Sequence, residues 1–436
     1  MRNLIIYMNK HKKTLLNILL FKLLLDLSYL FYVQKRYDYY GFILDFNLIK
    51  EIESIIFIIL IFFCISKINN KYSKFIISLL YILSIMPIFT LYSFENQSRL
   101  FTYSIFIGFF ITTLMARYPI KSLIKFSGPK KCNSSVLKQR YNNIFMLILF
   151  LFSLATYTLL IYYNGIPTFK AFNLSKVYEI RSSNRMPRYV NYMFFWQSKV
   201  INPFLLGLFI LKRNKLMSLL IIILQISLFL ITAHKIVLFS MILVVSTIII
   251  LKFKSVLNIL LSSFNIVVSF SFFLYIINIS EWPASLFIRR LLFAASQNGY
   301  YYYEYYSNNK LVFLSHSVLK RFIEYPYNLL PTYNIGAEYY DNPKTSANAG
   351  YLADAYMNFG ITGVILFSII LGIILIFINL LSETINSTII ATATILGFFS
   401  LNDSALLTSL MTNGIILGIL LSVSAKFLIS NRKLPT

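Results

Sequence analysis

The chain has 436 residues, 58% of them hydrophobic, and a formal net charge of +25. A mean hydropathy of +0.71 excludes an ordinary soluble domain and is typical of polytopic membrane proteins. The charge does not indicate a nucleic-acid-binding protein, because the basic residues lie in short segments between apolar ones and form no basic face on a soluble domain.

About twenty apolar residues cross a bilayer, and by this measure the sequence predicts an all-α fold with about twelve transmembrane helices. The first runs over residues 15–33; no small-residue cleavage site follows it, which predicts a membrane span and not a signal peptide. Asn402, Asp403 and Ser404 interrupt the apolar run between the last two spans. The predicted centres lie near Leu24, Ile58, Ile82, Ile107, Phe152, Phe204, Gln225, Leu243, Ser269, Leu366, Thr394 and Leu420.

The distribution of charge predicts the orientation of these spans. With both termini in the cytoplasm, the inner segments hold more than half of the 40 Lys and Arg residues but a single acid, Glu383. Cytoplasmic loops of membrane proteins carry such an excess of basic residues. Two external segments, residues 164–192 and 280–350, are then too long to be simple turns, which is typical of functional loops.

The first external segment is basic and contains the stretch YEIRSSNRMPRY, residues 178–189. Pro187 divides its arginines, since the residue before a proline avoids helical geometry. Arg181 and Arg185 are therefore expected to share a short helix, and Arg188 to begin the next transmembrane helix. Guanidinium groups suit phosphate oxygens, which predicts a site for a lipid-linked phosphate; contact with lipid headgroups is the alternative.

The second external segment is nearly neutral and rich in tyrosine, above all in GYYYYEYY, residues 299–306. Tyrosine offers a flat apolar face and a hydroxyl group, which suits sugar rings, although aromatic residues also gather at membrane interfaces. His316 lies in this segment and His234 lies before Lys235 between two spans; either histidine could transfer protons, and Lys235 could contact a phosphate.

Other polar residues have structural or catalytic interpretations. Asp354 begins the helix after the second segment, on one face with Tyr351 and Asn358, where it could accept a proton or complement the helix dipole. Lys22 and Asp26 form an i, i+4 pair within the first span and are expected to neutralise each other. No zinc, phosphate-loop, dinucleotide or metal–nucleotide motif is present in the sequence.

Three stretches resemble the bacterial oligosaccharide repeat-unit polymerases, the Wzy-type enzymes of O-antigen and capsule synthesis. They are SANAGYLADAYMNFGITGVILFSIILGIIL (residues 346–375), RRLLFAASQNGYYYYEYYSNN (289–309) and TAHKIVLF (232–239). The first resembles the family's approach to a helix followed by a glycine turn at Phe359, Gly360 and Gly363. The resemblance implies a multi-span helical glycosyltransferase of the broad C type.

The resemblance also implies a reaction. A hydroxyl of one undecaprenyl-diphosphate-linked repeat attacks the anomeric carbon of another, and the lipid diphosphate leaves, with external arginines holding the diphosphate and neither metal nor cofactor required. Expected partners are the lipid-linked glycan, membrane lipid and a chain-length regulator protein, in the bacterial cytoplasmic membrane with the site facing outward. The residues assigned to catalysis are Arg181, Arg185, Arg289 and His316, and those assigned to substrate binding are Arg188, Lys235, Arg290, Tyr302, Arg321 and Asp354.

Three other functions are compatible with the sequence. An O-antigen ligase has a similar build but moves finished polymer onto another acceptor. A lipid-linked oligosaccharide flippase or polysaccharide exporter should place ionisable residues along a path through the bilayer, where the sequence predicts only Lys22 and Asp26. A structural partner in a cell-envelope complex would leave the basic segment without a purpose.

Overall fold

The computed structural model describes residues 2–118, 135–172, 180 and 186–426. Within these ranges every regular element is a helix, and no strand occurs. The chain divides into two compact units, one made of Met1–Tyr118, Phe253–Ile376 and Phe399–Leu406, the other of Pro119–Lys252, Phe377–Phe398 and Leu407–Thr436.

In the described part of the chain, nine helices are long and apolar enough to cross a membrane, which is the build of a polytopic membrane protein. The remaining predicted centres also fall in helices: Ile58 in α3 (Leu48–Ser66), which carries three charges, and Leu243 and Thr394 in the shorter apolar helices Lys235–Ile250 and Ser387–Asn402. The nine are His11–Tyr40, Lys71–Phe94, Arg99–Arg117, Gln139–Asn164, Arg188–Leu211, Lys215–Thr232, Val256–Ile276, Tyr351–Ser382 and Leu406–Ser424. A total of about twelve spans and their orientation stay predictions.

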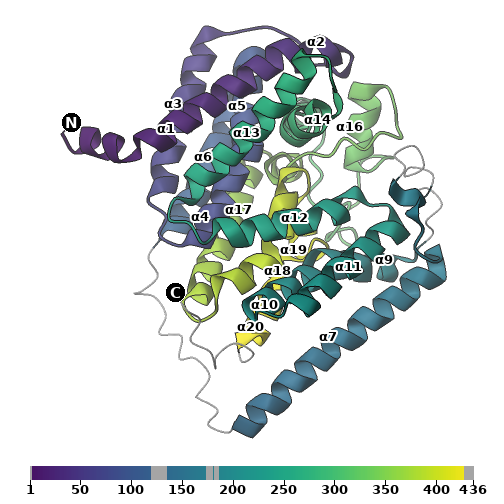
Figure 1. The fold of residues 1–436 in the computed structure, drawn as a ribbon. Coiled ribbons are helices and arrows are strands. Elements are labelled where there is room, and N and C mark those ends of the chain that lie inside the picture. Colours follow the sequence, from purple (N-terminus) through teal and green to yellow (C-terminus); the bar gives the residue numbers. More distant parts are fainter. Residues whose placement is uncertain (1, 119–134, 173–179, 181–185, 427–436) are drawn as a thin grey trace. The chain divides into compact units, whose positions relative to one another are not determined.

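The first unit is built around two pairs of neighbouring helices. Figure 1 shows α1 beside α13, and α3 packs on α5. Three segments of wider π-helix interrupt the helices of this unit, a feature often found at functional sites. Its elements are α1 (Arg2–Ser28), η1 (Tyr29–Val33), α2 (Gln34–Tyr37), η2 (Asp38–Tyr40), α3 (Leu48–Ser66), α4 (Lys71–Leu80), η3 (Tyr81–Ile85), α5 (Met86–Phe94), α6 (Arg99–Arg117), α13 (Val256–Ile276), α14 (Trp282–Ala284), η7 (Ser285–Phe293), α15 (Ala294–Asn308), α16 (Pro331–Tyr340), the greater part of α17 (Tyr351–Ser382) and η8 (Ser400–Asn402).

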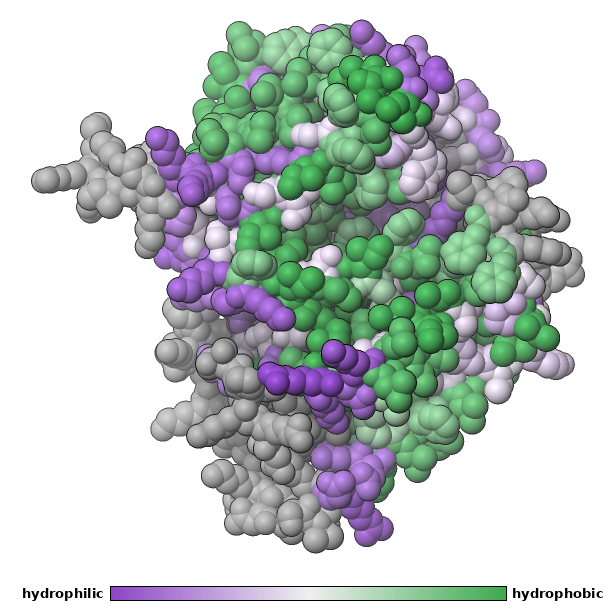
Figure 2. Space-filling model, viewed as in Figure 1, coloured by the Kyte–Doolittle hydropathy of each residue, from purple (hydrophilic) through white to green (hydrophobic). Residues whose placement is uncertain are grey.

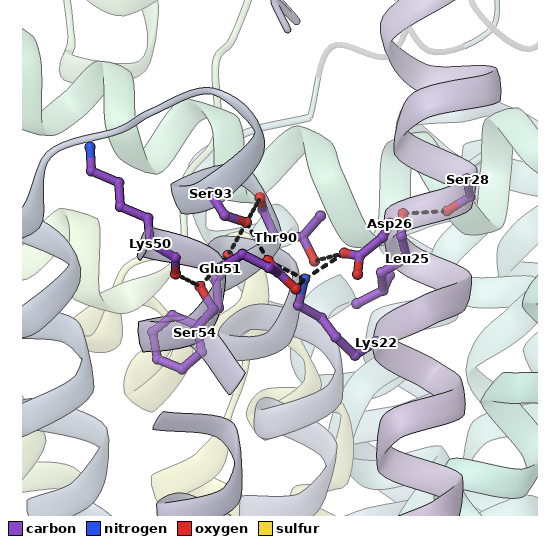
Figure 3. A network of polar contacts seen from close by, with 10 residues as sticks. Lys22, Leu25, Asp26, Ser28, Lys50, Glu51, Ser54, Thr90 and Ser93 are labelled. Carbon is purple, nitrogen blue, oxygen red and sulfur yellow. Dashed lines mark hydrogen bonds and ion pairs between the residues drawn. The ribbon is translucent and has the colours of Figure 1, made fainter. Parts of the chain in front are cut away.

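A buried charge network joins α1 to α3 and α5 (Figure 3). The Lys22 ammonium lies 2.5 Å from the Asp26 carboxylate and 2.8 Å from that of Glu51. Thr90 donates a hydrogen bond to Asp26 at 3.2 Å, and Ser93 donates one to Glu51 at 2.6 Å. The expected pairing of Lys22 with Asp26 is present, but a second acid shares the ammonium, so the pair is not the self-contained unit that the i, i+4 spacing suggests.

The long helix α17 is sharply bent near its start. Phe359 and Gly360 leave helical geometry, and Gly360 has a φ of +63°. Residues 351–358, before the bend, are all buried. Gly363 then packs so tightly that a Cβ on it would meet the Ala355 carbonyl oxygen at 2.1 Å. The bend lies at the glycine turn noted in the sequence.

Asn402 ties separate parts of the first unit together. Its side chain accepts a hydrogen bond from Ser84 at 2.7 Å and donates one to the Leu291 carbonyl at 3.0 Å. A Cβ on Gly350 would lie 2.8 Å from the Asn402 carbonyl oxygen, so the chain entering α17 passes directly against this turn. The interruption predicted after the penultimate span is therefore a packed junction.

The second unit has an uncharged polar core. The Gln225 amide donates to Ser240 at 2.9 Å and accepts from Asn202 at 2.7 Å, while Gln197 donates to Asn202 at 2.7 Å. Hydrogen bonds of this kind join helices where water is excluded. The elements of the unit are α7 (Ser135–Asn164), η5 (Phe169–Phe172), α9 (Arg188–Trp196), η6 (Gln197–Ile201), α10 (Asn202–Leu211), α11 (Lys215–Thr232), α12 (Lys235–Ile250), α18 (Ser387–Phe399), α19 (Leu406–Met411) and α20 (Ile415–Ser424).

Large apolar side chains are exposed along the outward faces of the helices. Leu16, Leu19 and Leu20 on α1 and Ile266 and Phe270 on α13 are among them. Figure 2 shows broad hydrophobic areas, in green, on the face that it draws. Exposed apolar side chains gathered in this way suit contact with lipid.

We predict that Lys22→Met destabilises the fold, because it leaves the Asp26 and Glu51 carboxylates facing each other without a cation. Breaking a buried ion pair in this way costs about 3–5 kcal/mol. Thermal unfolding of the purified protein in lipid nanodiscs measures the loss. Lys13→Met, at an exposed position of the same helix, is the control; equal unfolding temperatures for the two variants would contradict the prediction.

We also predict that Gly363→Ala disrupts the bend in α17, since its methyl group cannot coexist with the Ala355 carbonyl oxygen. Overpacking against a backbone atom should lower the free energy of unfolding by at least about 3 kcal/mol. Gly299→Ala is the matched control, because the nearest atom to its added Cβ lies 3.8 Å away. That helical substitution should be neutral or stabilising by roughly 1 kcal/mol, and similar losses for both variants would refute the interpretation.

Candidate functional site

Arg289 lies in the π-helix η7 and is held by two aromatic rings. Its guanidinium carbon lies 4.4 Å from the centre of the Tyr37 ring and 5.6 Å from that of Tyr40. Its one hydrogen bond within the described residues is a long one, 3.5 Å to the Ser285 hydroxyl, and the buried Nε has no partner there. Arg289 is thus positioned by cation–π contacts, and N–H donors of its guanidinium have no partner among the described residues.

No carboxylate among the described residues lies within ion-pair distance of Arg289. Glu281, the acid nearest to it in sequence, accepts a hydrogen bond from the Tyr37 hydroxyl at 2.7 Å and lies 3.4 Å from Arg36. Three other cations of the first unit have partners within the protein. Lys22 binds two acids, Arg99 pairs with Glu53 at 3.3 Å, and the Lys50 ammonium donates to the carbonyls of Asn96 and Gln97.

A buried acid lies within the same unit, at the end of α5. Glu95 is 4% exposed and accepts hydrogen bonds from Tyr29 at 2.7 Å and Gln97 at 2.9 Å. Burial raises the pKa of Glu95 to about 8, although hydrogen bonds from Tyr29, Gln97 and Gln297 act in the opposite direction. Glu95 is not within ion-pair distance of Arg289, and its raised pKa favours the uncharged form of the carboxyl group.

The tyrosine-rich run does not form one exposed aromatic face. It belongs to α15, whose tyrosines point to different neighbours: Tyr300 bonds Thr102 and the Ile88 carbonyl, while Tyr303 stacks on Phe101. Four of its six tyrosines, Tyr300, Tyr301, Tyr302 and Tyr306, are buried. The run therefore packs residues 280–350 against α5 and α6. Tyr302, a predicted substrate contact, is covered at 3% exposure.

Two other predicted residues, Asp354 and His316, lie in the segments that follow this helix. Burial raises the pKa of Tyr302, and the nearby Asp354 carboxylate adds to the effect. Asn358 donates to Asp354 at 3.3 Å and accepts from the Leu314 amide at 2.8 Å, which fastens the loop after α15 to α17. His316 lies in that loop beside the Tyr325 ring; burial lowers the pKa of His316, and its buried Nδ1 has no hydrogen-bond partner in the described residues.

The remaining predicted residues are divided between the two units. Arg290 and Arg321 are exposed in the first unit. In the second unit, Arg188 begins α9 directly after Pro187, as predicted, and Lys235 begins α12. Arg181 and Arg185 lie outside the described residues. No group of three or more His, Cys, Asp or Glu residues in the described ranges could hold a metal ion.

The sequence reasoning missed Tyr37, Tyr40 and Glu95. The available signal for the two tyrosines was the stretch QKRYDYYG, residues 34–41, which places two basic residues and three tyrosines directly after the first span. On the predicted outer side, Lys35 and Arg36 depart from the positive-inside tendency, just as the arginines near residue 185 do. Basic residues on the predicted outer side therefore indicate this turn as a candidate site, as they do for the arginines near residue 185.

Glu95 should make folding stability depend on pH. Because its folded-state pKa of about 8 lies above the ordinary value of 4.5, the folded chain keeps a proton that the unfolded chain loses between these values. The free energy of unfolding should therefore fall as the pH rises through this window. Glu95→Gln should reduce this dependence of the free energy of unfolding on pH, which is measured by unfolding at a series of pH values. If the free energy of unfolding falls in parallel for the variant and the unaltered chain, the prediction is wrong.

Comparisons with known proteins identify no family for this chain. The chain matches no protein-family model, and neither a curated protein nor a solved structure is significantly similar to it.

Proposed function

We propose that the chain is a membrane glycosyltransferase that polymerises undecaprenyl-diphosphate-linked oligosaccharide repeats into O-antigen or capsular polysaccharide at the outer face of the bacterial cytoplasmic membrane. The observation that carries the proposal is the state of Arg289: a half-buried guanidinium, oriented by Tyr37 and Tyr40, with no acid at ion-pair distance in the described residues. A cation left in this state is suited to binding an anion from outside the chain.

The reaction requires stabilisation of a leaving diphosphate. A hydroxyl oxygen of the acceptor repeat forms a bond to the anomeric carbon of the donor, the bond from that carbon to the diphosphate oxygen breaks, and the hydroxyl proton passes to a base. Negative charge grows on the departing oxygen, where a preoriented guanidinium is most effective. Arg289 would supply this charge, with Arg290 and Arg321 of the same unit as further contacts. The roles expected of Arg181, Arg185 and Arg188 stay predictions.

The buried polar groups favour this proposal over a transporter. Transport through a bilayer calls for ionisable groups along the path. The ionisable group that joins α1, α3 and α5, formed by Lys22, Asp26 and Glu51, is internally paired. The polar core of the second unit around Gln225 is uncharged.

The proposal is tested with the full chain in liposomes, supplied with lipid-linked repeats and scored by the ladder of products. Arg289→Ala should lower kcat/KM by at least about a hundredfold, as expected when a charge-stabilising donor is lost. Arg289→Lys should recover only part of the rate, because lysine keeps the charge but not the planar fork. Lys320→Ala removes an exposed cation of the same segment and should leave kcat/KM unchanged.

Two results would overturn the proposal. One is a ladder made equally well by Arg289→Ala and Lys320→Ala. The other is the absence of any ladder with the unaltered chain while finished polymer is transferred to a second acceptor, which would identify a ligase. In cells, deletion should leave single repeats for a polymerase and polymer retained on its lipid carrier for a ligase.

A further inference from the structure

The turn that follows the first span presents aromatic rings beside Arg289. Tyr37, Tyr39 and Tyr40 lie with ring centres 4.5 to 6.3 Å apart, and the rings of Tyr39 and Tyr40 are the closest pair. Tyr39 is 69% exposed and its ring has no other aromatic neighbour in the described residues. The exposed Tyr39 ring therefore lies next to Tyr37 and Tyr40, the two rings that contact the guanidinium.

This turn is fixed in place by α15. The Tyr301 hydroxyl donates to the Tyr40 carbonyl at 3.0 Å, and the Gln297 amide donates to the Gly41 carbonyl at 3.2 Å. Gly41 has a φ of +83°, and a Cβ on it would meet the Tyr301 hydroxyl oxygen at 2.0 Å. The backbone of the turn is thus held by a helix distant in sequence, and its tyrosines are preorganised.

A second group of rings borders the turn from α16. Tyr340 meets Tyr40 edge to face at 5.7 Å, and Tyr339 stacks on Tyr301 at 4.2 Å. The Tyr340 hydroxyl donates to Asn298 at 2.6 Å, which fixes this ring as well. Burial raises the pKa of Tyr340, while the positive charge of Arg289 acts against that rise, so the guanidinium lies within electrostatic reach of both groups of rings.

We propose that Tyr39 and Tyr40, bordered by Tyr340, form the subsite for the sugar that is attached directly to the diphosphate bound by Arg289. Sugar rings pack their apolar C–H faces on flat aromatic rings, and tyrosine hydroxyls add hydrogen bonds. The phosphate and the sugar of a glycosyl diphosphate are covalent neighbours, and here the Tyr40 ring contacts both the guanidinium and the exposed Tyr39 ring. The subsite rests on the proposed function and gives it a recognition element outside the predicted loops.

Binding measurements separate the sugar contact from the phosphate contact. The full chain in phosphatidylcholine nanodiscs is titrated with two probes: the lipid-linked repeat extracted from cells that lack the chain, and undecaprenyl diphosphate without sugar. Tyr39→Ala should weaken binding of the repeat about tenfold and leave undecaprenyl diphosphate unaffected. Tyr39→Trp should retain binding of the repeat, because it keeps a flat aromatic ring.

Controls distinguish failure of the subsite from failure of the proposed function. Tyr162→Ala removes another exposed tyrosine, 79% exposed on α7, and should affect neither probe. Arg289→Ala should weaken both probes. Unchanged binding of the repeat to Tyr39→Ala overturns the subsite, and so does an equal loss for both probes, which would make Tyr39 a lipid or phosphate contact. Normal binding of both probes to Arg289→Ala instead overturns the proposed function.

Discussion

A charge surrounded by apolar helices needs partners from the protein, and the Lys22 ammonium meets this requirement with one acid from its own helix and one from α3. Thr90 and Ser93 bring α5 into the same network. α1 is thereby fixed against α3 and α5, within about two helical turns of the point where it continues through η1 and α2. Tyr37 and Tyr40 lie at the end of that continuation. The network thus fixes the helix that leads to them, and α15 holds the turn itself.

Lys22 and Arg289 have different roles in this unit: Lys22 stabilises the fold, and Arg289 belongs to the candidate site. Lys22 is saturated by protein carboxylates, and its removal is expected to cost stability. Arg289 is held by ring faces instead, which orient a guanidinium without neutralising it. Glu281 bonds Tyr37 and Arg36, and Glu95 keeps a raised pKa, so neither of these acids neutralises Arg289.

Local signals in the sequence predicted many elements of the fold. Each expected span centre falls in a helix, the bend of α17 occurs at Phe359 and Gly360, and Pro187 precedes the start of α9. Hydrophobic runs, glycine and proline act within a few residues of themselves, so their effects can be recognised without the rest of the chain. The tyrosines of residues 299–306 could not be assigned in this way, because their burial depends on helices α5, α6, α16 and α17, which surround α15 after folding.

By itself, then, the sequence determined that the chain is a helical, membrane-type protein, approximately where its apolar helices lie, and in which stretches arginine and tyrosine are concentrated. Only the tertiary structure decided which cations lack an acid. It brought Glu51 to Lys22, Glu281 to Arg36, and Tyr37 and Tyr40 to Arg289. The physical reason is that charge pairing and ring contact act over a few ångströms in space, between residues that are far apart along the chain.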